Sequence, residues 1–236
     1  MRQVYRLESR LQAYYMNYPV NEIFETIQGE GCYTGVPAIF IRLQACPVGC
    51  AWCDTKHTWE KSESTQVKQS LVIDISNESD CWADFTENDI LNLLAKYTAK
   101  HVVITGGEPC IYDLIPLTEL LNNAGYSTQI ETSGTFEIKT HANTYVTVSP
   151  KVNMKGGYEV LNSALNRANE IKHPVATQQH IDDLDELLAK IDDLTDKTVC
   201  LQPISQKKRA TELVIQTCIK RNWRLSAQMH KYLFID

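Results

Sequence analysis

Three cysteines that could bind one metal centre lie close together at Cys46, Cys50 and Cys53, with the spacing Cys-x3-Cys-x2-Cys. They follow an apolar run at 38–43 that predicts a buried strand. Structural zinc sites use four protein ligands, often as two separated pairs, and the sequence holds no second Cys-x-x-Cys pair. A four-iron cluster bound by only three cysteines leaves one iron open to a ligand from outside the protein. The spacing therefore favours an iron–sulfur centre with an open iron.

Two other interpretations of this loop stay open. Cys32 or His57 could complete a zinc site with the three cysteines. The three cysteines could also be unrelated buried residues, although Pro47 and Gly49 indicate a loop and not a packed element. The other cysteines show no ligand spacing and are interpreted as small apolar residues: Cys32, Cys81, Cys110, Cys200 and Cys218.

A second segment suited to ligand binding is Thr-Gly-Gly-Glu-Pro at 105–109, at the end of a predicted strand at 101–105. Because glycine lacks a side chain, a ligand can approach the backbone closely there. A carboxylate or carbonyl group nearby can accept hydrogen bonds from an ammonium group of the ligand. Many strand-to-helix turns use Gly-Gly, so the pair gains its meaning from its position one strand–helix unit after the cysteines.

The elements that must position these residues alternate along the chain. Strands are predicted at 38–43, 101–105, 127–131, 145–149, 170–173, 198–202 and 224–228. Helices are predicted from the capping box Thr-Glu-Asn-Asp at 86–89, around 114–121, at 182–191 and at 211–221. Segments 132–144 and 150–169 leave room for at most a short helix. Strands that alternate with helices imply a parallel sheet, so the predicted fold class is α/β, a modified, partial (β/α) barrel with reduced helices.

The length of 236 residues fits one domain, which we place at 16–236. Residues 1–15 precede an internal methionine and are interpreted as an appended or mis-started extension, and the polar segment 61–85 as an insertion. The net charge of −6 argues against nucleic-acid binding as the main function. Apolar runs are far shorter than the roughly 20 residues of a membrane-spanning helix, and the N-terminus does not look like a secretory signal. We therefore expect a cytoplasmic protein with reduced thiols.

The cysteine loop and the Gly-Gly-Glu segment together resemble the radical S-adenosylmethionine (radical SAM) superfamily. The resemblance implies a [4Fe-4S] cluster whose open iron binds the amine and carboxylate of SAM. It also implies that one electron from the reduced cluster cleaves SAM to a 5′-deoxyadenosyl radical. The protein's part is then to position the reactants and to exclude water.

Longer stretches are similar to the 7-carboxy-7-deazaguanine synthase family of this superfamily, and most similar to its enterobacterial-type members. These stretches lie at 25–31, 35–43, 53–57, 101–109, 131–134, 148–151, 201–203 and 230–233. The resemblance implies conversion of 6-carboxy-5,6,7,8-tetrahydropterin to 7-carboxy-7-deazaguanine with loss of ammonia, in queuosine biosynthesis. It also implies that SAM is regenerated at each turnover and that Mg²⁺ assists.

Arg42 is a candidate for contact with the substrate, because it lies at the end of a predicted strand just before the cysteine loop. A guanidinium there suits bidentate capture of the substrate carboxylate, and the alternative is a structural ion pair with Glu30. His230 fits a pterin contact or a structural histidine equally well. The substrate contacts that the resemblance adds to Arg42 are Ile27, Gln28, Gly29, Thr105 and His230.

For SAM and magnesium the assignments rest on the resemblance. The magnesium ligand would be the Thr55 hydroxyl, and the alternative is that Asp54 or Thr55 caps a helix. Lys151 could also be a solvated loop lysine. Ser133 and Gln202 are weaker candidates for contact with the adenosine. The SAM-binding residues that the resemblance implies are Trp52, Cys53, Asp54, Gly107, Ser149, Pro150 and Lys151.

The resemblance also implies partners: a small-molecule pterin substrate, an electron donor such as flavodoxin, and a second copy of the chain in a homodimer. It implies no membrane partner and no direct contact with nucleic acid. One rival function is another radical SAM enzyme, such as a glycyl-radical activase, which needs no carboxylate clamp like Arg42. The other is a zinc-binding interaction module, which the acidic net charge and the missing second cysteine pair disfavour.

Overall fold

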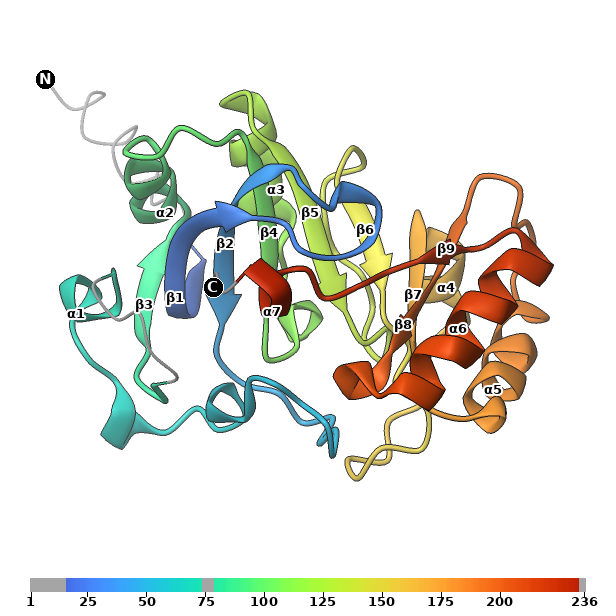
Figure 1. Ribbon diagram of the computed structural model, residues 1–236. Helices are drawn as coiled ribbons and strands as arrows, with labels where there is room; N and C mark the ends of the chain where they lie inside the picture. Colours follow the sequence, from blue (N-terminus) through green and yellow to red (C-terminus); the bar gives the residue numbers. More distant parts are fainter. Residues whose placement is uncertain (1–15, 74–78, 234–236) are drawn as a thin grey trace, which may run out of the picture.

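The computed structural model describes residues 16–73 and 79–233, which form one nine-stranded sheet with the strand order β3-β1-β2-β4-β5-β6-β7-β8-β9. From β2 to β9 all neighbouring strands are parallel. The sheet curls around one side of the molecule, with helices next to it (Figure 1). This arrangement confirms the predicted α/β class and partial barrel. The predicted extension at 1–15 lies outside the described residues.

All seven predicted strands are present, although β9 contains only 2 residues. Two further strands, β1 and β3, were not predicted. The bounds are β1 (Asn17–Ile27), β2 (Pro37–Leu43), β3 (Ala83–Thr86), β4 (His101–Gly106), β5 (Ser127–Thr132), β6 (Tyr145–Val148), β7 (Glu170–Val175), β8 (Thr198–Pro203) and β9 (Arg224–Leu225).

The two unpredicted strands form one edge of the sheet. β1 runs antiparallel to both β2 and β3, so the prediction of a wholly parallel sheet is wrong at this edge. Pro19 lies within β1, and proline in a run of residues argues against a central strand. Pro19 lies opposite Asp84 of β3, whereas the pairing of β1 with β2 begins only at Val20, so the proline lies in a part of β1 where the strand register runs along one side.

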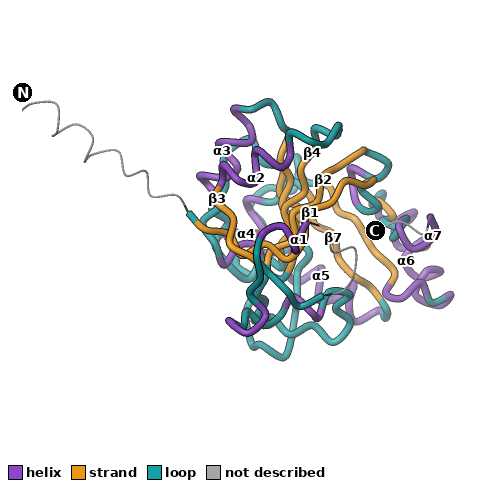
Figure 2. The backbone as a smooth tube through the Cα atoms, turned by 90° about the vertical axis from the view of Figure 1, so that its left-hand side faces the viewer, coloured by secondary structure: helices purple, strands orange, loops and turns teal. Residues whose placement is uncertain are grey.

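Most helices lie outside the strands, as Figure 2 shows. In the described part of the chain, no helix has both the length and the apolar character needed to cross a membrane. The α-helices are α1 (Gln69–Ile73), α2 (Glu87–Leu94), α3 (Ile115–Asn123), α4 (Asn162–Arg167), α5 (Gln178–Leu188), α6 (Lys208–Arg221) and α7 (His230–Leu233). Short 3-10 helices are η2 (Gly31–Tyr33), η3 (Lys56–Thr58), η4 (Glu63–Thr65), η5 (Pro109–Ile111) and η6 (Ile204–Gln206).

Side chains alternate between the two faces of the parallel strands, as the twofold repeat of a strand requires. Ile130, Ile171 and Leu201 are fully buried in the hydrophobic core, and β5, β7 and β8 contact α3, α5 and α6. Their neighbours in sequence, such as Glu131 and Lys172, face the interior of the barrel. The sheet therefore has an apolar outer face under the helices and a polar inner face.

The segment 61–85 contains η4, α1 and β3 and is tied to the rest of the fold. Trp82 is buried and its indole N–H donates to the Ser62 carbonyl oxygen at 2.9 Å. The end of the segment pairs with β1 through β3. The interpretation of this segment as an insertion stays a prediction, but its last residues belong to the central sheet.

The predicted capping box at the start of α2 is confirmed, and it generates a test of helix stability. Thr86 Oγ1 accepts the Asp89 N–H at 3.2 Å, and Asp89 Oδ2 accepts the Thr86 N–H at 2.9 Å. We expect Thr86→Ala to lower the free energy of unfolding by about 1 kcal/mol. Thr177 precedes α5 without a side-chain capping bond, so Thr177→Ala is the matched control. Urea denaturation under anaerobic conditions measures both variants; equal losses would contradict the prediction.

Candidate active site

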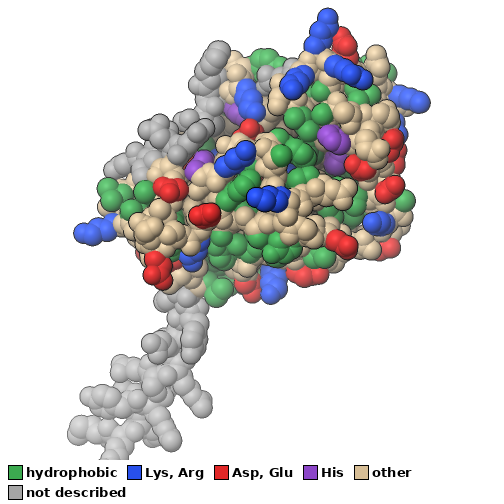
Figure 3. All heavy atoms as spheres, turned by 90° about the horizontal axis from the view of Figure 1, so that it is seen from below, with side chains coloured by type: hydrophobic (Ala, Val, Ile, Leu, Met, Phe, Trp, Pro, Cys, Tyr) green, Lys and Arg blue, Asp and Glu red, His purple; other side chains and the backbone are tan. Residues whose placement is uncertain are grey.

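A cavity of about 350 Å³ lies at the carboxyl ends of the parallel strands, where barrel enzymes place their chemistry. The arrowheads of β2, β5 and β6 point toward the lower side of Figure 1, and Figure 3 shows the molecule from that side, with apolar side chains gathered near the middle of the face. Of the predicted site residues, Pro150 is buried and does not line the cavity. The predicted residues that line it are Ile27, Gln28, Gly29, Arg42, Cys46, Cys50, Trp52, Cys53, Asp54, Thr55, Thr105, Gly107, Ser133, Ser149, Lys151, Gln202 and His230.

The loop that carries the three cysteines is closed at its base by hydrogen bonds. The buried Gln44 side chain donates from Nε2 to the carbonyl oxygens of His57 at 3.1 Å and Glu60 at 2.7 Å. The Cys46 N–H donates to the Trp59 carbonyl oxygen at 3.0 Å. These bonds bring the two ends of the loop together, so that all three cysteines line one cavity.

The three thiols share an environment that suits a cationic centre. Burial raises the pKa of Cys46 to about 11 and also raises the pKa of Cys50. The Cys53 sulfur accepts the Thr55 backbone N–H and the Trp59 indole N–H, both at 3.4 Å. Thiolates held this way need a nearby positive charge to stay deprotonated. The donor set of three thiols in one cavity fits an iron–sulfur cluster.

The proposed zinc alternative does not fit the structure. Neither Cys32 nor His57 lines the cavity that holds the three cysteines. Cys32 lies instead beside Glu170 and Cys200, away from this loop. The interpretation that Cys32 or His57 completes a zinc site with the cysteine loop is therefore wrong.

Gly106 and Gly107 allow the end of β4 to pack directly against the start of the cysteine loop. A Cβ atom on Gly107 would lie 2.1 Å from the Ala45 carbonyl oxygen, and one on Gly106 would lie 2.2 Å from the Leu43 nitrogen. Contacts this short do not occur, so neither position accepts a side chain without a shift of backbone. Close packing of the backbone therefore requires glycine at both positions. This requirement was not predicted from the sequence, where the pair was interpreted as allowing a ligand to approach.

The carboxylate of Glu108 is not free to receive a ligand's ammonium group. It is buried and accepts hydrogen bonds from Thr132 Oγ1 at 2.6 Å, from the Ser133 N–H at 2.8 Å and from the Cys110 N–H at 3.0 Å. The Ser133 hydroxyl also contacts it. Glu108 therefore joins the loops that follow β4 and β5, and it positions Ser133 at the cavity wall.

A lysine buried inside the barrel forms ion pairs with two carboxylates that line the cavity. Lys172 on β7 pairs with Glu30 Oε2 at 2.6 Å and with the carboxylate of Glu131 on β5. Burial alone would lower the Lys172 pKa, but the two carboxylates outweigh it and raise that pKa. Burial would raise the pKa of Glu30, but Lys172 lowers it to about 2. Lys172 and Glu30 are therefore both charged at neutral pH.

Arg42 lies where the sequence analysis placed it, but its ion-pair partner differs. Its Nε pairs with Glu22 on β1, not with Glu30, so the alternative pairing with Glu30 is wrong. Within residues 16–73 and 79–233, the terminal nitrogens of Arg42 make no hydrogen bond. The pair with Glu22 orients the guanidinium and leaves its outer edge available to an anion in the cavity.

Two further alternatives from the sequence are wrong. Thr55 precedes η3 without a side-chain capping bond, and Asp54 Oδ2 instead lies 3.4 Å from both Gln228 Nε2 and Lys231 Nζ. Lys151 is not a solvated loop lysine, because burial lowers its pKa and its Nζ donates to Ser149 Oγ at 2.5 Å.

The C-terminal segment covers one side of the cavity. The Met229 N–H donates to the Gly29 carbonyl oxygen at 3.0 Å, and Gln228 Nε2 donates to Glu30 Oε1 at 3.0 Å. A Cβ on Gly29 would lie 2.9 Å from His230 Nδ1. His230 thus packs on the loop after β1 and also faces the cavity.

Several polar residues of the cavity were missed by the sequence analysis, including Glu30, Glu131, Lys172 and Gln228. In β5 and β7 an isoleucine stands between polar or charged residues, as Gln129-Ile130-Glu131 and Glu170-Ile171-Lys172. In a sheet with helices on its outer face, such alternation indicates that the polar residues point inward. That pattern could have identified Glu131 and Lys172.

A partial barrel with three cysteines on the loop after β2, next to a cavity at the carboxyl ends of its strands, defines the class of radical SAM enzymes. Comparison with known proteins agrees with this class. Residues 27–140 match the family model described as a 4Fe-4S single cluster domain. The iron–sulfur cluster and SAM are the cofactors of this class.

Individual proteins specify the family. The 7-carboxy-7-deazaguanine synthase of Escherichia coli (strain K12) is 62% identical over 222 residues, which cover 93% of this chain and 100% of that relative. The enzyme of the same name from Buchnera aphidicola subsp. Schizaphis graminum is 48% identical over the same shares. The crystal structure of QueE from Escherichia coli superposes with a TM-score of 0.89 at 62% identity, over 91% of this chain and 95% of that chain. The chain belongs to the 7-carboxy-7-deazaguanine synthase family.

The contact between Gly107 and the cysteine loop can be tested through cluster content. We expect Gly107→Ala to lose most of its iron after anaerobic reconstitution, because the new Cβ displaces Ala45, next to Cys46. Gly125→Ala is the control for backbone strain without a clash, since its φ is +86° but a Cβ there meets nothing within 4 Å, and we expect it to keep its iron. Iron and sulfide analysis measures both variants, and circular dichroism checks their fold. A folded Gly107→Ala protein with full iron content would refute the expectation.

Proposed function

We propose that this protein is a radical SAM enzyme that converts 6-carboxy-5,6,7,8-tetrahydropterin to 7-carboxy-7-deazaguanine with loss of ammonia, as a step of queuosine biosynthesis. The observation that carries the proposal is one cavity in which the cysteine loop, Arg42 and the Lys172 network face each other. The family of the chain supports the same reaction. It disfavours both rivals, the glycyl-radical activase and the zinc-binding module.

We assign Cys46, Cys50 and Cys53 as the ligands of the [4Fe-4S] cluster, with SAM on its open iron. When bound, the reduced cluster would supply the electron for reductive cleavage of SAM. The loop closed by Gln44 would hold the cluster. SAM would contact the predicted set Trp52, Cys53, Asp54, Gly107, Ser149 and Lys151, and Ser133 and Gln202 are further candidates at the cavity wall.

For the substrate, we assign the carboxylate to Arg42, whose guanidinium is oriented by Glu22. The pterin ring would lie against Ile27, Gln28, Gly29, Thr105 and His230, which line the same cavity. Holding the ring in one orientation selects one hydrogen for removal, and such positioning contributes several kcal/mol of rate acceleration.

We assign Mg²⁺ to the Thr55 hydroxyl. The hydroxyl lines the cavity and lies 3.7 Å from Cys53 Sγ, so it would hold an ion beside the cluster loop. Because Mg²⁺ keeps most of its waters, one protein ligand suffices. The resemblance to the family supports three further proposals about the protein: it forms a homodimer, it receives electrons from a flavodoxin-like donor, and it is located in the cytoplasm.

An anaerobic assay tests the function. Reconstituted protein receives the pterin acid, SAM, Mg²⁺ and a chemical reductant, and mass spectrometry follows the product. We expect 7-carboxy-7-deazaguanine with no partner protein present, a lower rate without Mg²⁺, and no product from Cys50→Ala. Cys218→Ala is the control, because Cys218 is buried on α6 outside the cavity. Absence of product from protein with a full cluster would overturn the proposal.

The role of Arg42 predicts a kinetic effect. We expect Arg42→Ala to keep its iron and to raise KM, since truncation of one partner in a buried charged pair costs about 2–5 kcal/mol, or roughly 30-fold or more. Glu22→Gln removes the charge that orients the Arg42 guanidinium, but it leaves the guanidinium in place to bind the carboxylate. It therefore separates the two effects. We expect its effect on KM to be smaller. An unchanged KM in Arg42→Ala, measured by steady-state kinetics, would exclude the assignment.

A further inference from the structure

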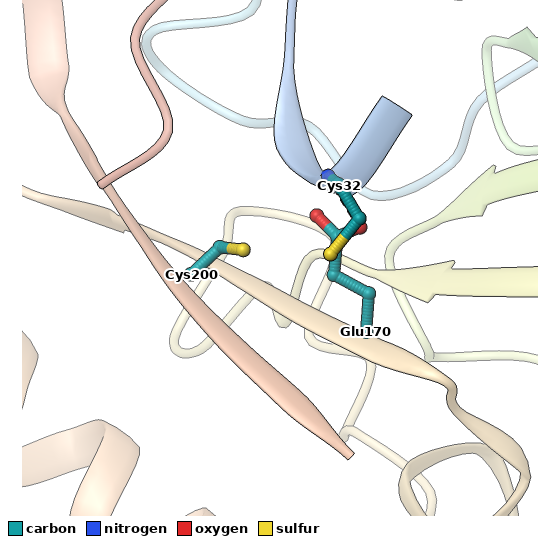
Figure 4. A group of neighbouring side chains, drawn as sticks. All are labelled: Cys32, Glu170 and Cys200. Atoms are coloured by element: carbon teal, nitrogen blue, oxygen red, sulfur yellow. Dashed lines mark hydrogen bonds between the residues drawn. The ribbon is translucent and has the colours of Figure 1, made fainter. Parts of the chain in front are cut away.

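Three potential metal ligands lie together inside the barrel, below the floor of the cavity. Cys32 comes from η2, Glu170 from the start of β7 and Cys200 from β8, and their side chains converge (Figure 4). One ligand atom from each lies within 4.8 Å of the other two. From the sequence, both cysteines are interpreted as small apolar residues without ligand spacing, and the structure places them next to each other.

The carboxylate of Glu170 lacks a full set of partners. Glu170 is 0% exposed, and its Oε1 has no hydrogen-bond partner. Its Oε2 accepts the Cys32 N–H at 3.0 Å and lies 3.5 Å from the Tyr145 hydroxyl. A buried carboxylate oxygen without a partner is costly. Such an oxygen beside two thiols is a position where a cation is expected.

The surroundings of Cys32 stabilise a thiolate. The neighbouring Cys200 thiol is the main influence, and together with Tyr145 and Glu170 it outweighs burial and lowers the pKa of Cys32 to about 5. Burial raises the pKa of Glu170 to about 7. Cys32 is half-buried, so an ion from solvent can reach the group with little movement of the chain.

We propose that Cys32, Glu170 and Cys200 bind one Zn²⁺ ion, at a site separate from the iron–sulfur cluster. Two thiolates and a carboxylate are a donor set that zinc favours over magnesium or calcium. In a tetrahedral zinc site the ligand atoms stand roughly 3.3–3.8 Å apart, so the three atoms need to close by at most about 1.5 Å. Binding releases the thiol proton of Cys200, whose pKa is raised, whereas Cys32 is already a thiolate. Tyr145 or a water completes the set.

The position of the site indicates a structural role. Its ligands join η2, which follows β1 near one edge of the sheet, to β7 and β8 near the other edge. No strand pairing joins these two sides in the described residues. An ion here would tie the open barrel together beneath the cavity. Tyr33, next to Cys32, already holds η2 in place. Its ring stacks on His101, with the ring centroids 4.3 Å apart, and makes an edge contact with Tyr145, with the centroids 4.8 Å apart.

Metal analysis of the full-length protein with its cluster reconstituted tests the proposal. The protein is incubated with Zn²⁺ under anaerobic conditions, dialysed, and analysed for zinc, iron and sulfide by mass spectrometry. We expect about one zinc per chain beside a full cluster. The Cys32→Ser/Cys200→Ser variant is expected to lose the zinc and keep the iron. Cys218→Ser is the matched buried control and is expected to keep both metals.

Two further measurements keep the test decisive if the double variant does not fold. Glu170→Gln preserves the shape of the side chain, and we expect zinc affinity to fall by more than the roughly 10–100-fold that loss of an outer-shell partner causes. Co²⁺ in place of Zn²⁺ on the wild-type protein is expected to give a sulfur-to-metal charge-transfer band that Glu170→Gln alters. The proposal is overturned if the wild-type protein retains no zinc. It is also overturned if Cys50→Ser loses the zinc while the Cys32→Ser/Cys200→Ser variant keeps it. A Cys32–Cys200 disulfide in the zinc-treated protein overturns it as well.

Discussion

The pairing of one buried lysine with two carboxylates is the constraint on which the interior of this barrel depends. Lys172 is 3% exposed, and it joins Glu30, from the loop after β1, to Glu131 on β5. Removal of one partner from a buried ion pair costs about 3–5 kcal/mol, because the remaining charge stays buried without compensation. The three charges therefore hold opposite sides of the barrel at a fixed distance and make the cavity wall rigid.

This constraint extends to the C-terminal segment. Glu30 Oε1 also accepts hydrogen bonds from Gln202 Nε2 at 3.3 Å and from Gln228 Nε2 at 3.0 Å. Gln228 reaches Asp54 on the cysteine loop at 3.4 Å. The loop after β1, the last strands and the cluster loop are thus connected through one carboxylate. A ligand that contacts any of these segments binds to a preorganised site, and preorganisation reduces the entropy lost on binding.

Local patterns in the sequence predicted the parts of the fold and site that depend on neighbours in the chain. The cysteine spacing located the cluster loop, and the capping box located the start of α2. Glu22 could not be predicted as the partner of Arg42 in this way. It lies on the antiparallel strand β1, and Pro19 in that segment argues against a strand. Cys32 and Cys200 likewise have no spacing signal, since only the curvature of the sheet brings them together. Interactions between distant strands are set by topology, which a single sequence encodes weakly.

The interior of the barrel has two polar layers, and one short segment connects them. Glu30 belongs to the layer that lines the cavity, and Cys32 belongs to the layer below it, beside Glu170. Gly31 between them has φ = 66°, and a Cβ there would lie 2.2 Å from Glu170 Oε1. A movement of η2 would therefore displace Glu30 from Lys172. Whatever fixes Cys32 against β7 and β8 consequently also fixes the carboxylate that organises the cavity, although it touches neither the cluster nor the substrate.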